Sequence, residues 1–142
     1  NNYDTGSLYV EENGCWRVIG PTAPGPQAFN TGGEIEIWTS QDQGDTWERS
    51  RQLTRDSRFN HGYCRKPINA HPEFYSLWAD GHGREVSTSR LYFCNRDGSE
   101  VFMLPPEMDG EFARPVPYAD SRSLLERTGT DDRGRALDSR TD

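Results

Sequence analysis

Residues 61–71 (HGYCRKPINAH) hold the side chains of this sequence that are best suited to chemistry. Alternate residues of an extended strand share one face. One side of this stretch would therefore present His61, Tyr63, Arg65, Pro67, Asn69 and His71. Arginine pairs bidentately with carboxylates, and tyrosine or histidine can move protons. The pattern predicts a site for an acidic sugar, with catalytic roles for His61, Tyr63 and Arg65 and substrate-binding roles for Asn69 and His71.

Structural roles for the same side chains compete with this interpretation. Tyr63 could pack against neighbouring elements, Arg65 could pair with an acid such as Asp56, and His61 could satisfy a buried carbonyl. The residue types alone leave both interpretations open.

Metal and cofactor chemistry has little support in the sequence. Cys64 would face away from His61 and His71 on an extended strand, so these residues and His82 do not predict a metal site. We expect no cofactor, because no P-loop, dinucleotide-binding, zinc-finger or nucleophile-elbow motif occurs. The three cysteines cannot all pair within the chain. Buried thiols are expected at Cys15 and Cys94, and the disulfide state of all three cysteines stays open.

Eight extended segments are expected to position these residues. Apolar alternation, aromatic runs and turn residues predict strands over residues 6–11, 15–20, 34–39, 46–54, 61–70, 73–79, 90–94 and 100–104. The Pro- and Gly-rich residues 21–33 predict a loop. We therefore expect an all-β fold followed by a polar tail, in which residues 121–127 could form one or two helical turns.

The turn between the third and fourth segments carries a typed motif, S-x-D-x-G-x-T-W, formed by Ser40, Asp42, Gly44, Thr46 and Trp47. Its aspartate can accept bonds from turn N–H groups, and its glycine can adopt positive φ. A shortened version, Asn95-x-Asp97-Gly98, lies 55 residues after Asp42. This spacing predicts two similar four-stranded units of the size of a propeller blade, over residues 1–58 and 59–118, with the tail at 119–142.

The composition and charge of the chain limit the kinds of partner that it can bind. The chain has 142 residues, a net charge of −7, and 11% aromatic but only 32% hydrophobic residues. We expect no nucleic-acid partner and no membrane partner, because the chain is acidic and has no long apolar run. An acidic polysaccharide would need a local basic patch. The sequence starts at Asn1, which suggests a processed form or a fragment.

Many short matches connect the sequence with one family. They are found at residues 3–9, 16–22, 25–27, 32–35, 40–47, 60–71 and 78–81. This set resembles the later blades of BNR-4 repeat (Asp-box) β-propellers, a group that includes seven-bladed lyases of the ulvan and rhamnose–glucuronate type. The resemblance implies a secreted or periplasmic protein that acts on uronate glycans by β-elimination. It also implies that Arg65 neutralises the carboxylate, that His61 and Tyr63 transfer protons, and that Ser40, Asp42, Gly44 and Trp47 are structural.

Two blades cannot close a propeller, which needs at least about four. The implied partners are therefore missing blades from the same precursor, another chain or further copies, together with an acidic polysaccharide or oligosaccharide. Two alternatives to the lyase stay open. One is a non-catalytic carbohydrate-binding or scaffolding propeller, and the other is a sialidase-like hydrolase.

Overall fold

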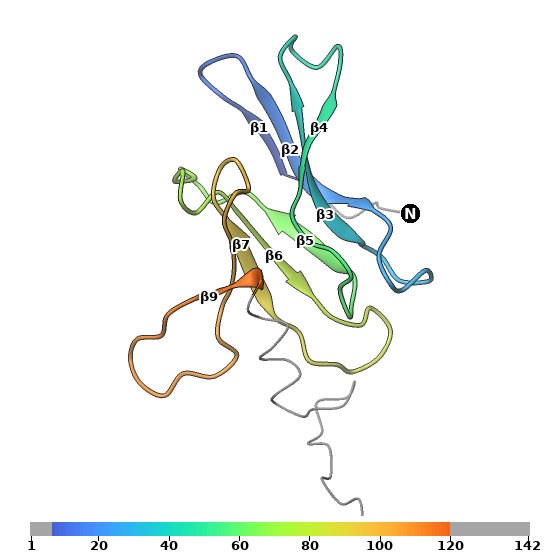
Figure 1. Cartoon of the computed structure of the whole chain (residues 1–142), viewed down its shortest axis with the longest axis vertical. Helices are drawn as coiled ribbons and strands as arrows, with labels where there is room; N and C mark the ends of the chain where they lie inside the picture. Colours follow the sequence, from blue (N-terminus) through green and yellow to red (C-terminus); the bar gives the residue numbers. More distant parts are fainter. Residues whose placement is uncertain (1–6, 120–142) are drawn as a thin grey trace, which may run out of the picture.

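The chain folds into two antiparallel β-sheets in a computed structural model, which describes residues 7–119. The first sheet contains β1 (Ser7–Val10), β2 (Trp16–Ala23), β3 (Glu34–Ser40) and β4 (Glu48–Gln52) in sequential order (Figure 1). The second contains β5 (His61–Arg65), β6 (Ser76–Asp80), β7 (Leu91–Cys94), β8 (Val101–Met103) and β9 (Val116–Pro117), also in sequential order. Residues 7–117 contain no helix, and no helix of the described residues could cross a membrane. The predicted all-β class is confirmed.

Besides shifts of one to three residues at other strand ends, three features differ from the sequence prediction. Strand β2 continues through Pro21 to Ala23, into the expected loop, with its register against β3 shifting between Gly20 and Ala23. A proline is tolerated at such an irregularity because it has no N–H to donate to the ladder. Strand β5 ends at Arg65, and β9 adds a fifth strand to the second sheet, where four were expected.

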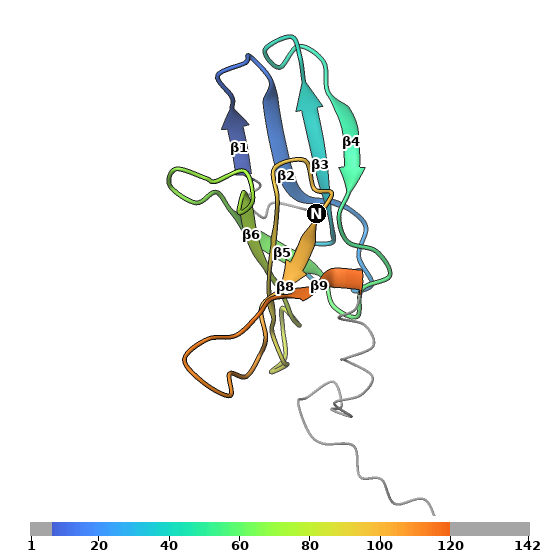
Figure 2. The same ribbon diagram turned by 60° about the vertical axis from the view of Figure 1, so that its left-hand side comes forward.

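The core lies between the two sheets. It combines Tyr9, Ile19, Ile35, Ile37 and Leu53 of the first sheet and its ends with Cys64, Tyr75, Trp78, Tyr92, Cys94 and Met103 of the second. The Tyr9 and Tyr75 rings stack at 4.3 Å, and the Tyr9 hydroxyl donates to the Tyr75 carbonyl at 2.5 Å. The sheets therefore share one hydrophobic core. Figure 2 shows the strands of the two sheets from a second direction.

Each sheet also has apolar side chains on the face turned away from this core. Cross-strand pairing aligns Leu8, Val18 and Trp38 in the first sheet, and Leu8 is 52% exposed. In the second sheet it aligns Leu77, Phe93 and Phe102. Both sheets thus combine a packed inner face with an apolar row on the outer face.

Backbone hydrogen bonds join the two sheets at the start of β5. Gly33, just before β3, pairs with His61 at the start of β5 through two backbone bonds of 2.9 and 2.7 Å. The expected unit boundary at residue 58 lies between β4 and β5. The expected helical turns at residues 121–127, and the tail beyond residue 119, lie outside the described residues.

Candidate functional site

A bulge in β5 separates the residues that the sequence places on one face. His61 pairs with Asp80 and Gly62 with Ala79, but Arg65 pairs with Leu77, so β5 has one residue more than β6 between these positions. The irregularity includes Tyr63, whose φ is +58°. A bulge of one residue reverses the alternation beyond it. As a result His61 is 2% exposed, whereas Tyr63 is 59% exposed and Arg65 is also exposed. The prediction of one shared face is wrong for His61.

The His61 ring is held between the sheets by two hydrogen bonds. Trp78 Nε1 donates to His61 Nδ1 at 3.0 Å, so the ring proton must lie on Nε2, which contacts Ser57 Oγ at 2.9 Å. Burial lowers the pKa of His61 from 6.5 to about 3. At neutral pH the ring is uncharged and both nitrogens are occupied. It therefore has neither a free lone pair nor a free proton to offer a substrate.

The network continues from Ser57 to a buried carboxylate. Ser57 donates to Glu34 through its backbone N–H at 2.9 Å and its hydroxyl at 2.8 Å, and Thr54 Oγ1 donates to Glu34 Oε2 at 2.5 Å. The resulting chain of donors runs from Trp78 through His61 and Ser57 to Glu34. It links both sheets, and its members satisfy one another as buried polar groups require.

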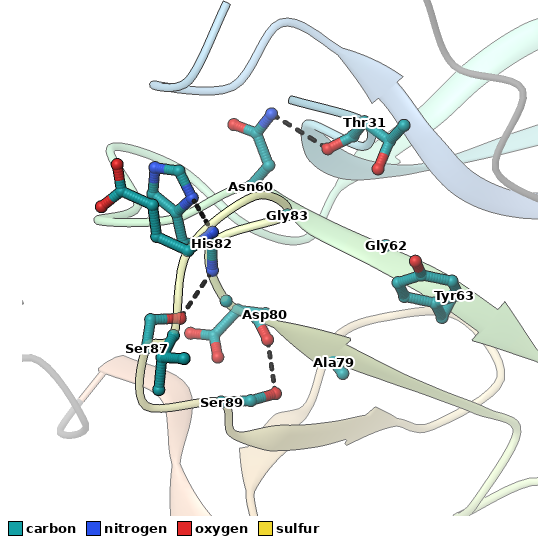
Figure 3. A pocket seen from close by; sticks show the side chains of 13 residues that line it. Thr31, Asn60, Gly62, Tyr63, Ala79, Asp80, His82, Gly83, Ser87 and Ser89 are labelled. Carbon is teal, nitrogen blue, oxygen red and sulfur yellow. Dashed lines mark hydrogen bonds between the residues drawn. The ribbon is translucent and has the colours of Figure 1, made fainter. Parts of the chain in front are cut away.

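Tyr63 lies at a polar cavity of about 390 Å³. The cavity is lined by Thr31, Asn60, Gly62, Tyr63, residues 79–83, Glu85, Val86, Ser87 and Ser89 (Figure 3). A left-handed backbone at a tyrosine costs roughly 1–2 kcal/mol. Such strain is typical of functional positions. The exposed ring and the adjacent polar wall make this cavity the candidate binding site.

Asp80 is the carboxylate of this cavity wall. Its Oδ1 accepts from the Arg90 N–H at 2.7 Å, and its Oδ2 accepts from the Tyr92 hydroxyl at 2.8 Å. Burial raises the pKa of Asp80, and these two hydrogen bonds only partly oppose the shift. A carboxyl group with a raised pKa in a cavity is a recognised sign of a functional site. The sequence prediction of site residues did not include Asp80.

Asn60 fixes the opposite wall. Its Nδ2 donates to the carbonyls of Gln27, Asn30 and Thr31, at 2.9, 3.3 and 3.1 Å. Its Oδ1 accepts from the Gln27 N–H at 3.0 Å. One amide side chain thus holds the loop between β2 and β3 against the start of β5. This gives the cavity a wall that is set by hydrogen bonds rather than by a regular element.

The remaining predicted site residues do not gather at this cavity. Arg65 lies on the outer face beside Leu77 and bonds the Cys64 carbonyl at 3.2 Å. Asn69 follows the end of β5, has φ +54° and lines a different cavity. His71 is exposed, and its Nδ1 accepts from the Glu73 N–H at 3.2 Å. The structure therefore leaves Tyr63 and Arg65 exposed together and separates Asn69 from Tyr63.

The Asp-box turn has the geometry that its motif predicts. Asp42 accepts from the Thr46 N–H at 2.8 Å and the Thr46 hydroxyl at 2.6 Å, and Ser40 Oγ donates to Asp42 at 2.7 Å. These bonds lower the pKa of Asp42 to about 2. Trp47 Nε1 donates to the Gly44 carbonyl at 3.0 Å. Gly44 has φ +95°, and a Cβ there would lie 2.9 Å from the Trp16 ring. All of these interactions are internal to the sheet, and none belongs to the Tyr63 cavity.

The described residues include three cysteines and no candidate metal-binding cluster. Cys15, Cys64 and Cys94 are buried, as expected for Cys15 and Cys94, and none of them forms a disulfide within the described residues. Within residues 7–119, no cluster of three His, Cys, Asp or Glu side chains could hold a metal ion.

No protein family, no curated protein and no solved structure matches this chain. The functional argument therefore rests on the residues and the geometry given above.

Proposed function

We propose that this chain forms two neighbouring blades of a larger Asp-box β-propeller that binds uronate-containing glycans. The observation that carries the proposal is Tyr63, an exposed and strained aromatic residue at a polar cavity, with exposed Arg65 two residues further along the same strand. The proposed location is secreted or periplasmic, where such polymers are found.

The propeller part of the proposal is supported by the sheets themselves. Two antiparallel sheets with sequential strand order share a core and carry a complete Asp-box and a shortened one. The rows Leu8–Val18–Trp38 and Leu77–Phe93–Phe102 add apolar outer faces. A further blade would cover the row Leu8–Val18–Trp38 in the same way that the two sheets cover each other, whereas Arg65 beside Leu77 has to stay accessible to the glycan.

The glycan part is supported by the chemistry around Tyr63. An exposed ring offers an apolar surface to a sugar ring, and the groups of Asp80 and Ser89 offer hydrogen bonds to hydroxyls. The Arg65 guanidinium can pair with a carboxylate in a bidentate geometry. Because the chain has a net charge of −7, such a local cation is needed to hold an acidic polymer.

A second candidate function is cleavage of the same glycan by β-elimination. The exposure of Tyr63 two residues from Arg65 favours it. Tyr63 would take the α-proton, the C4–O bond would break as the double bond forms, and the leaving oxygen would take a proton from water, while Arg65 neutralises the uronate carboxylate. His61 is a poor acid or base for this reaction, because both ring nitrogens are bonded within the core. Tyr63 is therefore the proton-transfer residue that we propose for a lyase.

Calorimetry with a uronate oligosaccharide tests the binding function in the complete assembly. We expect Arg65→Ala to weaken binding at least about tenfold, since a charge-assisted pair contributes roughly 1.4 kcal/mol or more. Arg65→Lys should restore part of the affinity, because lysine lacks the planar fork. The matched control is Arg114→Gln, which removes one exposed charge outside the cavity.

Ultraviolet absorbance distinguishes binding from cleavage in the same samples. A lyase product carries an unsaturated uronate that absorbs, whereas a hydrolase product does not. Growth of absorbance that Tyr63→Phe abolishes would establish the lyase. Binding without absorbance growth would establish the non-catalytic module, and wild-type affinity in Arg65→Ala would refute the proposed site.

A further inference from the structure

A second cavity, of about 550 Å³, lies where the end of β1 meets the segment after β5. Its wall includes Glu11, Glu12, Lys66, Asn69, Tyr75 and Arg96. It shares no lining residue with the cavity at Tyr63. Its charged groups are unusual for this acidic chain, and the site proposed above does not use them.

Lys66 is the only lysine among the 16 basic residues of the chain. Its Nζ lies 5.0 Å from the centre of the Tyr9 ring, which itself stacks on Tyr75. This cation–π contact stabilises the position of the ammonium group. Lys66 is exposed, and within residues 7–119 no carboxylate pairs with it. The ammonium group is therefore held in place while its N–H donors stay available.

Arg96 is the second cation, and Glu11 fixes its orientation. Glu11 accepts from Arg96 Nε at 3.2 Å and Nη2 at 2.5 Å, from Arg17 Nε at 2.9 Å and from the Tyr75 hydroxyl at 2.8 Å. The bonds to the two arginines and Tyr75 lower the pKa of Glu11 to about 2, although burial opposes them. One carboxylate thus serves two guanidinium groups. Arg96 Nη1 has no partner within the described residues.

The charges around the cavity give a small positive excess. The lining itself holds two positive charges, Lys66 and Arg96, and two negative ones, Glu11 and Glu12. The excess of one comes from Arg17, which pairs with Glu11 from outside the lining. A monoanion would balance this set, whereas a neutral ligand would leave the excess unpaired. Asn69 adds an exposed amide at a left-handed backbone position, φ +54°, which asparagine tolerates better than most residues.

We propose that this cavity binds one monoanionic oxyanion, the carboxylate or sulfate group of an acidic sugar, between Lys66 and Arg96. That the ligand is a sugar follows from the proposed function, whereas its oxyanion group is inferred from the residues of this cavity alone. An acidic glycan would then have a second charged contact in addition to Arg65.

The single lysine allows a direct test. Reductive methylation with ¹³C-formaldehyde retains the positive charge and gives one lysine signal in the NMR spectrum of the full chain. We expect this signal to shift saturably with sodium glucuronate or with glucose 6-sulfate, and not with glucose. The larger response of the two acids identifies whether the natural group is a carboxylate or a sulfate. Equal shifts with sodium chloride at matched ionic strength would overturn the proposal.

Calorimetry on the unmodified protein gives an independent measurement. Lys66→Gln should weaken binding of the preferred acid at least about tenfold, Lys66→Arg should retain most of it, and Arg114→Gln should leave it unchanged. Lys66 is exposed, so its substitution should lower the thermal midpoint only by the small contribution of the cation–π contact with Tyr9. Unchanged affinity in Lys66→Gln would refute this site. If Arg65→Ala alone lost binding of the oligosaccharide, the proposed function would stand without this second contact.

Discussion

The buried and exposed sides of β5 place two residues that can both transfer protons in opposite environments. His61 is enclosed between the sheets, with Trp78 on one ring nitrogen and Ser57 on the other. Tyr63, two residues later, has positive φ and an exposed ring beside a polar cavity. The difference arises from a single extra residue in the strand, which turns one side chain into the core and the next towards solvent.

This comparison shows that residue type alone does not assign a catalytic role. Histidine is the usual proton-transfer residue near neutral pH, but a histidine that is desolvated and bonded on both nitrogens acts as a structural link. Within residues 7–119 the Tyr63 side chain forms no such hydrogen bonds, and its left-handed backbone has a conformational cost. Function should therefore follow the exposed side of β5, and stability should follow the buried side.

A substitution on the buried side of β5 should have the largest effect on the free energy of unfolding. His61→Ala would leave a cavity and remove the partners of the Trp78 N–H and the Ser57 hydroxyl. We expect a loss of about 3–4 kcal/mol in the free energy of unfolding, measured by chemical denaturation. The exposed His71→Ala should change this free energy by less than about 0.5 kcal/mol. A small effect of His61→Ala with a large loss of glycan binding would reverse our assignment.

His61 should also determine how the free energy of unfolding changes with pH. His61 has a folded-state pKa of about 3 and an ordinary pKa of 6.5, so below pH 6.5 the unfolded chain binds a proton that the folded chain does not. Stability should therefore fall with decreasing pH, by about 1.4 kcal/mol per pH unit between pH 6.5 and 4.5. Glu11, with its lowered pKa, adds a loss below about pH 4.5, while Asp80, with its raised pKa, acts in the opposite direction.

Denaturation at a series of pH values in His61→Gln checks this prediction. The slope between pH 6.5 and 4.5 should disappear in this variant and persist in His71→Gln. A slope that persists unchanged in His61→Gln would show that another group is responsible.

The sequence predicts the regular parts of the molecule better than its site. Alternation and aromatic runs predict most of the strands, and the typed turn at Ser40–Trp47 predicts its own hydrogen bonds, because these signals are local. The bulge at Tyr63 depends on the register against β6, which no local pattern specifies. Glu34 bonds Thr54, 20 residues away, and Glu11 bonds Arg96, 85 residues away, so these long-range contacts could not be found by spacing.

A smaller effect of opposite sign is expected on the exposed side. Tyr63→Gly should relieve the left-handed strain and raise the free energy of unfolding by about 0.5–1 kcal/mol, since the ring loses little packing. The same variant should lose glycan affinity, measured by calorimetry. A destabilised Tyr63→Gly with full affinity would mean that the ring packs rather than binds.

The smallest effect is expected at the Asp-box, which is exposed but structural. Asp42→Ala removes the acceptor for the Thr46 N–H and hydroxyl and should lower the thermal midpoint. Asp97→Ala in the shortened turn is the matched variant, since Asp97 accepts from the Ser99 N–H and hydroxyl. Glycan affinity of the folded protein should be unchanged in both. Lost affinity at an unaltered midpoint would make the box a binding site.

The central claim is that glycan binds on the exposed side of β5, and hydrogen–deuterium exchange of the complete assembly tests it most directly. Adding a uronate oligosaccharide should slow exchange at residues 60–65 and 79–83, which form the strand and the cavity wall beside Tyr63. Exchange in the Asp-box at residues 40–47 should stay the same. Protection confined to the Asp-box, or no protection at residues 60–65 when glycan is bound, would contradict this account.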